Sequence, residues 1–219
     1  MLLRNVRAIK NLKKSRFTAA FFVGLVITCT ACSRFKMHVD LSDADQWREG
    51  DIVLRAGWGM ESRAVILQGH STYSHVGLLH WDSTQNEWQV VHAVPGEDLP
   101  DRVKVDPVEE FYCPERAQGG AWLRVNCSDS IAQAAVQYAL SKVDQHILFD
   151  HDYLLGDTTQ LYCTELVWQS YLHQGLDVTD GQRHSVPSVF STEGECIFPN
   201  NLEESKTSLF VKPFKLTRL

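Results

Sequence analysis

The sequence predicts an α+β domain, and two patterns along the chain support this class. Short apolar segments bounded by glycine and turn residues fill the first half of the body, as expected for strands. Segments with helical periodicity dominate the second half, and this order is typical of α+β proteins rather than of alternating β-α units. With 219 residues, 44% of them apolar, the chain can bury the core of one domain.

The first half of the body contains three expected strands and one expected helix. The strands cover residues 50–57 (GDIVLRAG), 74–81 (SHVGLLHW) and 87–94 (EWQVVHAV), and the helix covers residues 60–69 (MESRAVILQG). In this helix Met60, Ala64, Val65 and Leu67 fall near one face, and Gly69 is expected to end it. The connection DSTQN is typical of a hairpin, so the second and third strands are predicted to be neighbours.

The second half adds one strand, two longer helices and two short segments. They are a strand at residues 121–125 (AWLRV), helices at 130–143 and 160–173, a helical turn at 185–190 and an extended segment at 209–216 (LFVKPFKL). Ser128 or Asp129 is expected to cap the first of the two helices, because short polar side chains accept hydrogen bonds from unpaired N–H groups there. Gly175 is expected to end the second.

The N-terminal segment has the layout of a secretory signal. Six positive charges lie within residues 1–16, and an uncharged, largely apolar run follows from Phe17 to Cys32. A basic region followed by an apolar stretch too short to span a bilayer comfortably is typical of export signals. The small residues Thr30 and Ala31 before Cys32 resemble the end of a bacterial lipoprotein signal, in which the cysteine is acylated and becomes the new N-terminus.

The sequence therefore predicts three regions: a signal with a lipid-attachment site at Cys32 (residues 1–32), a polar tether (33–47) and a folded domain (48–219). Ser33, rather than aspartate, follows the cysteine. By resemblance to Gram-negative lipoproteins, this favours the periplasmic face of the outer membrane. Cys29 stands where an aliphatic residue is usual, so an ordinary cleaved signal and an uncleaved membrane anchor stay open as alternatives.

The charge of the body argues against a nucleic-acid function. Residues 1–36 hold eight Lys or Arg side chains and no Asp or Glu, which leaves 13 basic residues against 27 acidic ones in the rest of the chain. Nucleic acids are bound through phosphate contacts made by clustered Lys and Arg. The acidic body has no basic cluster in its sequence, so we expect no nucleic-acid partner.

Cys163 is the first candidate for chemistry, because it falls in the first turn of the helix expected at 160–173. Unpaired backbone N–H groups and the positive dipole end at a helix N-terminus stabilise a thiolate. The same groups can hold the oxyanion that forms when a carbonyl is attacked. Asp157, Thr158 and Thr159 are the expected caps of this helix. The competing interpretation is a buried apolar cysteine with a structural role only.

A nucleophilic thiol needs a base, and strand alternation selects among the histidines. His75 shares one face of its strand with Gly77, whereas His80 points to the other face. Gly77 is expected to leave open space beside the His75 ring, as a substrate channel would need. His92 lies on the next strand, so two adjacent strands can present two imidazoles to one helix end. Glu165 is an unsuitable partner, because two helical steps turn it away from the thiol.

Four motifs in this order resemble the circularly permuted papain-like cysteine hydrolases, in the YaeF/YiiX-like branch of the NlpC-type amidase superfamily, several members of which are lipoproteins. They are GDIVLR, YSHVGLL, a strand ending in VVHAV, and FDHDY followed by LYCTELVW, and the resemblance covers residues 48–200. The histidine precedes the cysteine here, as the permutation requires. The resemblance implies an antiparallel sheet or half-barrel that carries the histidine and packs against a helix with the cysteine at its N-terminus.

The resemblance also implies roles for three residues: Cys163 as nucleophile, His75 as base and His92 as the polar group that orients the base. Relatives can carry glutamate at the third position, and a neutral histidine gives an imidazolium less electrostatic support than a carboxylate. Many relatives have tyrosine where this chain has Phe149 before Asp150. The implied reaction is attack on an amide or ester carbonyl through an acyl-enzyme, without a cofactor.

The remaining body cysteines allow more than one arrangement. Cys113, Cys127 and Cys196 can form one disulfide in an oxidising compartment and leave one thiol over, and the sequence does not choose the pairing. A zinc site built from Cys163 and the two histidines lacks the CxxC or HxxxH spacing of such sites. We therefore expect no metal.

The sequence predicts a cell-envelope thiol hydrolase that cleaves an amide bond, with cell-wall peptide as the first substrate to test. A lipid-directed amidase, esterase or acyltransferase is the enzymatic alternative, because related permuted domains handle acyl chains and a lipid anchor would place the site beside the membrane. A catalytically silent lipoprotein that binds a ligand in the same groove is the alternative from another class. Reactivity of Cys163 near neutral pH would favour an enzyme over the binding module.

Overall fold

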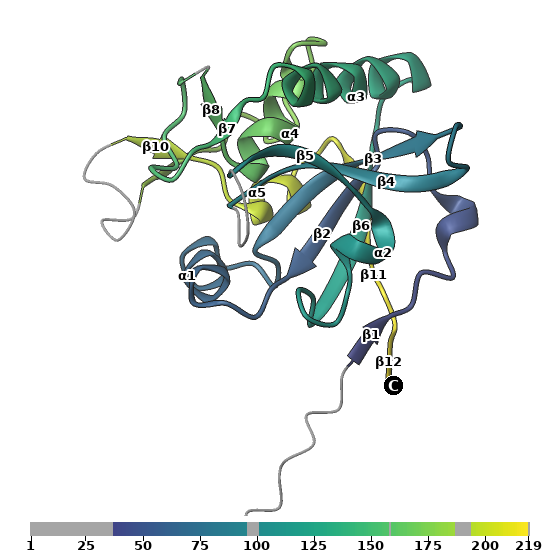
Figure 1. Cartoon of the computed structure of the whole chain (residues 1–219). Coiled ribbons are helices and arrows are strands. Elements are labelled where there is room, and N and C mark those ends of the chain that lie inside the picture. Colours follow the sequence, from purple (N-terminus) through teal and green to yellow (C-terminus); the bar gives the residue numbers. More distant parts are fainter. Residues whose placement is uncertain (1–36, 96–100, 158, 187–193, 219) are drawn as a thin grey trace, which may run out of the picture. The chain divides into compact units, whose positions relative to one another are not determined.

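The computed structural model describes residues 37–95, 101–157, 159–186 and 194–218, which fold around one curled sheet (Figure 1). Its strands lie in the order β11 (Ser208–Pro213), β6 (Gly119–Val125), β2 (Ile52–Ala56), β3 (His75–Asp82), β4 (Glu87–Val94), β5 (Arg102–Pro107), β7 (Leu148–Phe149) and β8 (Gln160–Leu161). Neighbouring strands are antiparallel except for β7 and β8, which are parallel. The predicted α+β class and half-barrel sheet are confirmed, and β3 and β4 lie at the centre of the sheet.

Alternating side chains send apolar residues to both faces of the sheet, so the protein has two cores. On β2, Ile52 and Leu54 enter the larger core, while Val53 enters the smaller core on the opposite face. On β3, Leu78 and Leu79 divide between the two cores in the same way. All five side chains are fully buried. Burial on both faces explains why these strands are nearly continuous apolar runs in the sequence.

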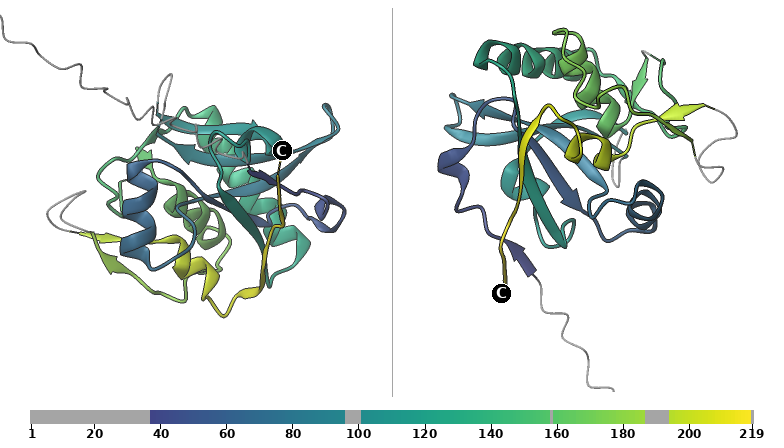
Figure 2. Two further views of the ribbon diagram at one scale, coloured as in Figure 1. Left: turned by 90° about the horizontal axis from the view of Figure 1, so that it is seen from below. Right: turned by 180° about the vertical axis from the view of Figure 1, so that it is seen from behind.

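Two helices cover the larger core: α3 (Asp129–Asp144) and α4 (Cys163–Leu172) lie over the same face of the sheet (Figure 2). Ser128 caps α3 as predicted, because its Oγ accepts a hydrogen bond from the Ile131 N–H at 3.4 Å. The buried face of α3 is made of small or branched residues at helical spacing, namely Ala132, Ala135, Val136 and Ala139. Small side chains let this helix approach the sheet and α4 closely.

Residues 37–47 belong to the folded body, although the polar composition of 33–47 predicted a tether. They form β1 (Met37–Val39), which pairs with β12 (Leu216–Arg218), and the 3-10 helix η1 (Ala44–Gln46). Val39 and Trp47 are buried in the smaller core, where Trp47 meets Phe214 edge-on with ring centroids 6.0 Å apart. Two widely spaced apolar anchors are enough to fix this segment, so the tether prediction is wrong for its described part.

The helix α1 (Met60–Gly69) has the predicted bounds but a different buried face. Val65 and Gly69 are buried, whereas Met60 is 80% exposed and Leu67 is 71% exposed. Gly69 lies against Phe198, because a Cβ atom at position 69 would come within 2.9 Å of the Phe198 Cβ. The helix is therefore covered along one narrow strip beside Phe198, and the two long apolar side chains point elsewhere.

Several short elements differ from the sequence-based expectation, either because no element was predicted there or because residues 160–161 and 185 were expected to be helical. They are β5, β7 and β8 of the main sheet, α2 (Val108–Phe111), α5 (Pro199–Glu203), and the pair of β9 (His184–Ser185) and β10 (Glu195–Cys196). The helical turn expected at 185–190 lies mostly outside the described residues, and its described Ser185 is extended in β9.

The predicted signal, with Cys29 and Cys32, lies outside the described residues. Within the described ranges, none of the helices is both long enough and apolar enough to cross a bilayer. Lipid attachment at Cys32 stays a prediction.

Candidate active site

Cys163 is the first residue of α4, and Tyr162 is its N-cap residue. The helix begins three residues later than predicted, because Gln160 and Leu161 are extended in β8. Asp157 does not cap the helix, since its Oδ1 accepts the Thr159 N–H at 2.8 Å within a turn of its own. The prediction that Cys163 lies in the first helical turn is confirmed, and the predicted start of the helix is wrong.

Two hydrogen bonds to one residue hold the start of α4 in place. The Tyr162 hydroxyl accepts from the Ile197 N–H at 2.8 Å, and the Thr164 hydroxyl donates to the Ile197 carbonyl at 2.6 Å. All three residues are buried. Because these bonds flank Cys163 on both sides along the chain, they fix the direction in which its side chain leaves the helix.

The beginning of β3 precedes its ladder with β4. The register of the two strands starts at the pair Leu78–Val91, three residues after His75. Here α4 packs against β3, and the N–H groups of Val76 and Thr164 point to the Cys163 sulfur. Because Val76 directly follows His75, this contact places the candidate nucleophile beside the strand segment that carries the candidate base.

His75 begins a buried hydrogen-bonded chain across three strands. Its Nε2 lies 2.8 Å from His92 Nδ1, and His92 Nε2 lies 3.1 Å from Asp106 Oδ2 on β5. The ring of Phe111 stacks on His75 and meets His92 edge-on, with ring centroids 5.6 Å and 5.2 Å away. The structure therefore brings His75 and His92 together as predicted and adds a carboxylate behind them.

This series of hydrogen bonds determines which ring nitrogens of His75 and His92 carry a proton. A carboxylate can only accept, so Asp106 receives the Nε2–H of His92, and His92 Nδ1 is left as an acceptor. His75 must then donate its Nε2–H to that nitrogen, which leaves Nδ1 of His75 with the free lone pair of a base. This tautomer is the one that a thiol proton acceptor needs.

Asp106 was not among the predicted site residues, because its strand was not recognised. Its pKa lies below the usual value: burial raises it, but the hydrogen bond from His92 and the Lys104 ammonium, 2.8 Å away, outweigh burial. Arg116 Nη1 adds a further contact at 3.3 Å. The alternation of Val103 and Val105 with polar residues was the available signal for this strand, and it assigns Asp106 to one face of the strand without identifying the neighbouring strand.

The expected stabilised thiolate is not found in the free protein. Burial raises the pKa of Cys163 to about 11, and the N–H groups of Val76 and Thr164 lower it only in part. Burial, followed by the nearby Arg55 guanidinium, holds the pKa of His75 well below its usual value. Both groups are thus neutral near pH 7, so the site holds a thiol and an imidazole rather than an ion pair.

The raised thiol pKa predicts the ionisation behaviour of Cys163. We expect the difference in thiolate absorbance between the protein and its Cys163→Ala variant to be absent at neutral pH. It should grow only in alkaline solution toward the pKa of about 11. An ultraviolet pH titration measures it directly. A thiolate signal that persists into weakly acidic solution would contradict a neutral resting pair.

Gly77 does not open a channel beside His75, and this expectation is wrong. A Cβ at position 77 would come 2.4 Å from Val90 Cγ1, 3.0 Å from the Val91 carbonyl oxygen and 3.1 Å from His92 Cβ. The missing side chain lets β4 approach β3 closely, so Gly77 serves the contact between His75 and His92.

Open space at the candidate site is instead provided by a cavity of about 780 Å³, which both Cys163 and His75 line and Gly77 does not. The loop before α1 and the start of that helix contribute Trp58 and Met60 to its wall, and β5 contributes cationic side chains. Within the described part of the chain, the hydrogen bond of the His75 ring runs to His92. The cavity thus brings thiol and imidazole to one place without a direct bond between them, as free enzymes often do.

The other singled-out side chains have separate partners. His80, on the opposite face of β3, bonds to Glu49 Oε1 at 2.7 Å. Glu165 accepts from Gln169 at 3.0 Å, away from the thiol, and burial raises its pKa to about 8. The four described cysteines, Cys113, Cys127, Cys163 and Cys196, are all free thiols. The described ranges contain no cluster of three or more His, Cys, Asp or Glu side chains suited to a metal.

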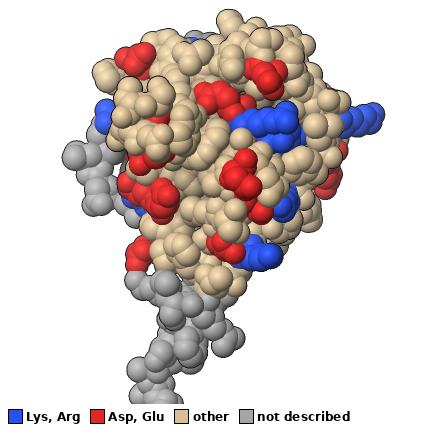
Figure 3. All heavy atoms as spheres, turned by 90° about the vertical axis from the view of Figure 1, so that its right-hand side faces the viewer, with Lys and Arg blue, Asp and Glu red and all other residues tan. Residues whose placement is uncertain are grey.

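The face seen in Figure 3 carries Lys and Arg side chains interspersed among Asp and Glu side chains. Positive charges on that face do not gather into one cationic patch. On this face the charges are therefore mixed in sign.

Comparison with known proteins points to one family. The model of the permuted papain-like amidases, the YaeF/YiiX C92 family, matches residues 46–207. The uncharacterized protein YiiX of Escherichia coli K12 is 29% identical over 147 residues, a match spanning 63% of this chain and 64% of that relative, which is less than two thirds of its length. The crystal structure of the metalloprotein yiiX from Escherichia coli O157:H7 superposes with a TM-score of 0.61, at 19% identity over 80% of this chain and 99% of that one. This structural likeness supports the fold.

Proposed function

Because this chain belongs to the family of permuted papain-like amidases that includes YaeF and YiiX, we propose that it is a thiol hydrolase that cleaves an amide bond. The observation that carries the proposal is the bonded series His75–His92–Asp106, which begins in the same cavity as Cys163. An activated thiol requires a base, and here the base is a buried imidazole with its lone pair on Nδ1. A carboxylate two hydrogen bonds away supports this imidazole. Cell-wall peptide is the first substrate to test.

The proposed reaction begins when the Cys163 sulfur attacks the amide carbonyl carbon. As the sulfur–carbon bond forms, the thiol proton moves to Nδ1 of His75, and the carbonyl becomes an oxyanion. Unpaired N–H groups at the start of α4 lie beside the sulfur and are placed to hold that charge. His75 returns the proton to the nitrogen as the carbon–nitrogen bond breaks. Water then attacks the thioester with the same base and restores the thiol.

His92 and Asp106 would act during the moments when His75 is charged. The imidazolium donates its Nε2–H to the neutral His92, whose pKa burial lowers to about 4 despite the hydrogen bond to Asp106. The negative charge of Asp106 reaches the imidazolium through this intervening ring. This arrangement supplies the electrostatic support that a histidine alone in the third role would lack.

The envelope location is part of the proposal and is supported by the sequence of the N-terminal segment. Its basic residues, short apolar run and small residues before Cys32 fit export and lipid attachment. The acidic body is suited to a partner other than nucleic acid. Membrane fractionation of cells that make the Cys32→Ser variant tests the anchor, because a lipidated protein should leave the membrane fraction when this cysteine is lost.

Substrate trials with purified peptidoglycan and with phospholipid vesicles test the reaction. We expect the protein to release new amino groups from peptidoglycan peptides, measured by amine labelling and mass spectrometry of the fragments. The Cys163→Ala variant should release none, because the nucleophile is lost. Cys113→Ala is the matched control, since Cys113 is another free thiol and does not line the cavity. Equal release by Cys163→Ala and the unchanged protein would overturn the proposal.

A lipid-directed amidase, esterase or acyltransferase is the second candidate, and one observation favours it. Trp58 and Met60, which line the cavity, are 44% and 80% exposed. Apolar side chains at the mouth of a cavity are suited to an acyl chain or a membrane surface. Product formation only in the vesicle trial would establish this candidate, and an unreactive Cys163 in both trials would favour a binding module.

A further inference from the structure

Arg55 occupies a position in the site that the reaction described above does not use. It lies on β2 directly opposite His75 in the strand register, so both side chains leave the same face of the sheet. Arg55 is 8% exposed, and it lines the cavity together with His75 and Cys163. A guanidinium is therefore buried beside the candidate base and within the cavity of the candidate nucleophile.

The contacts of Arg55 leave part of its guanidinium unused. Nη1 donates to the Phe111 carbonyl oxygen at 2.8 Å, and the guanidinium carbon lies 4.6 Å from the centre of the Phe111 ring. Nε is buried and has no hydrogen-bond partner. Across the residues that the structure describes, no carboxylate forms an ion pair with Arg55. A buried cation without a counter-ion is costly, so such a group calls for an explanation.

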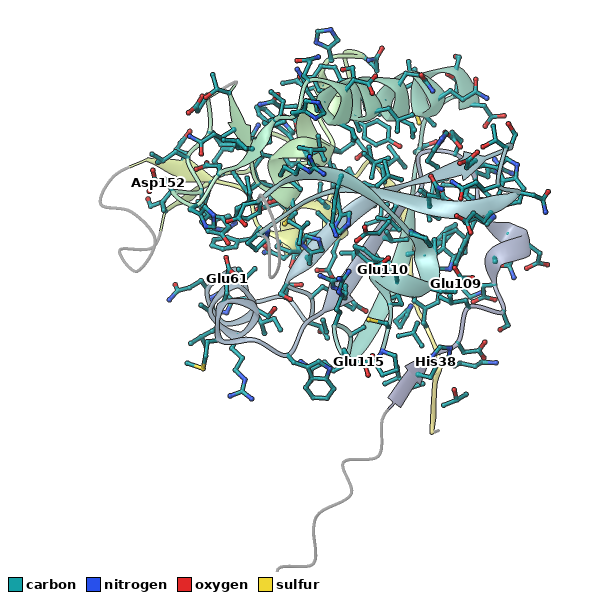
Figure 4. All side chains as sticks on the ribbon, in the orientation of Figure 1. His38, Glu61, Glu109, Glu110, Glu115 and Asp152 are labelled. Atoms are coloured by element: carbon teal, nitrogen blue, oxygen red, sulfur yellow. The ribbon has the colours of Figure 1, made fainter. Side chains whose placement is uncertain are left out.

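The surroundings of Arg55 favour an anion in the cavity. The cationic lining residues are Arg55, Arg102, Lys104 and Arg116, whereas the acidic ones are Glu61 on α1 and Glu115 after α2, both labelled in Figure 4. Asp106 neutralises part of this charge through Lys104 and Arg116 but makes no ion pair with Arg55. Burial, and then repulsion from Arg116, lower the pKa of Arg55 to about 10, so it stays charged at neutral pH.

We propose that Arg55 binds a carboxylate of the substrate, so that the preferred amides carry a free carboxylate next to the scissile bond. The proposal rests on the proposed amide hydrolysis and names its substrate class. With Nη1 engaged by Phe111, the free Nε edge of the guanidinium is the side that grips carboxylates through paired N–H donors. The bound carboxylate would supply the missing counter-ion and hold the neighbouring carbonyl near Cys163.

Two alkylating reagents of nearly the same shape test this without a known substrate. Iodoacetate carries a carboxylate beside its reactive carbon, and iodoacetamide carries a neutral amide there. In both reactions the Cys163 sulfur displaces iodide at the methylene carbon, and the thiol proton passes to His75 and then to solvent. The rate of each reaction at Cys163 is measured by mass spectrometry on the full chain. The iodoacetate rate is divided by the iodoacetamide rate, and this ratio is then divided by the same ratio for glutathione.

We expect the normalised ratio to favour iodoacetate by about tenfold or more, the effect of a hydrogen bond to a charged group. Arg55→Gln should abolish the preference, and Arg55→Lys should retain part of it, because the charge remains while the paired donors are lost. Arg63→Gln is the matched control, since it removes one exposed positive charge of α1 outside the cavity lining and should keep the preference. The rates are compared under conditions where circular dichroism shows every variant to be folded, because Cys163 of an unfolded chain would react with both reagents without a preference.

The outcomes separate this inference from the proposed function. An iodoacetate preference that depends on Arg55 supports the carboxylate site even if no amide is hydrolysed in the substrate trials. Equal normalised rates, or a preference that Arg55→Gln retains, overturn the carboxylate site even if peptidoglycan is cleaved. A preference lost to the same extent in Arg63→Gln also overturns it, because the effect would then come from the overall charge of the protein.

Discussion

Substituting His75 with alanine is expected to lower kcat/KM for amide hydrolysis by about 10²- to 10⁴-fold, the range of a general acid–base group. The pKa of Cys163 is about 11, so without a base very little thiolate is present at neutral pH. His92 cannot take over this task, because it is fully buried and its two ring nitrogens are engaged by His75 and Asp106.

His80→Ala is the matched control for this substitution. His80 lies on the same strand but on its opposite face, where its ring bonds to Glu49 rather than to a site residue. We expect kcat/KM to change by no more than about twofold, as for substitutions away from a site. Initial rates over a range of substrate concentrations give the comparison. If the two variants lose activity equally, the His75 imidazole is not the base and the effect is structural.

Gly77→Ala is expected to lower both stability and activity. The added methyl group would meet Val90 Cγ1 at 2.4 Å and the Val91 carbonyl oxygen at 3.0 Å, and the backbone oxygen cannot rotate away. Overpacking of this kind typically destabilises a protein by about 1–3 kcal/mol. Relief of the contact must move β4 away from β3, and this movement would lengthen the 2.8 Å bond between His75 and His92.

Gly119→Ala separates this effect from the general effect of glycine replacement. Gly119 is also a strand residue, at the start of β6, and a Cβ there would meet no atom within 4 Å. Denaturant unfolding should show a lower free energy of unfolding for Gly77→Ala and a nearly unchanged one for Gly119→Ala. A Gly77→Ala protein with undiminished stability and turnover would show that the close approach of β3 and β4 is not needed.

The neutral resting state of the thiol has a consequence for how the site works. Burial outweighs the helix N-terminus at Cys163, so the helix alone does not provide a ready thiolate. In the proposed reaction, proton transfer to His75 must therefore accompany attack on the substrate, and a substrate anion held beside the imidazole would stabilise the charged ring that results. The carboxylate proposed to bind Arg55 would add to the support that Asp106 gives from the other side.

Much of the sheet could be predicted from local patterns in the sequence. The strands at β2, β3 and β4 and the helices α1 and α3 lie where periodicity and turn residues predicted them. Short segments such as β7 and β8 were missed, because two residues cannot show a period. The start of α4 was predicted three residues early, since Gln160 and Leu161 fit a helix locally and are extended only because β7 pairs with them.

The residues of the candidate site also fall into those that the sequence predicted and those that it did not. Cys163, His75 and His92 were selected from motif order and strand alternation. In the structure His75 is hydrogen-bonded to His92, and Cys163 and His75 line the same cavity. Asp106 required the pairing of β4 with β5, and no strand was predicted at residues 102–107 although Pro95-Gly96 is a turn signal before it. The role of Gly77 was misjudged, because a missing side chain looks like empty space until the neighbouring strand is known.

The sequence by itself determined the α+β class, the family resemblance and the acidic body, and it selected the candidate thiol and its two candidate histidines, because these depend on residue type, order and local period. Only the tertiary structure decided the protonation of the thiol, the tautomer of His75, the carboxylate behind His92 and the uncompensated charge of Arg55. Each of these depends on burial and on partners distant in the chain, and desolvation and through-space contacts arise only when the strands are brought together.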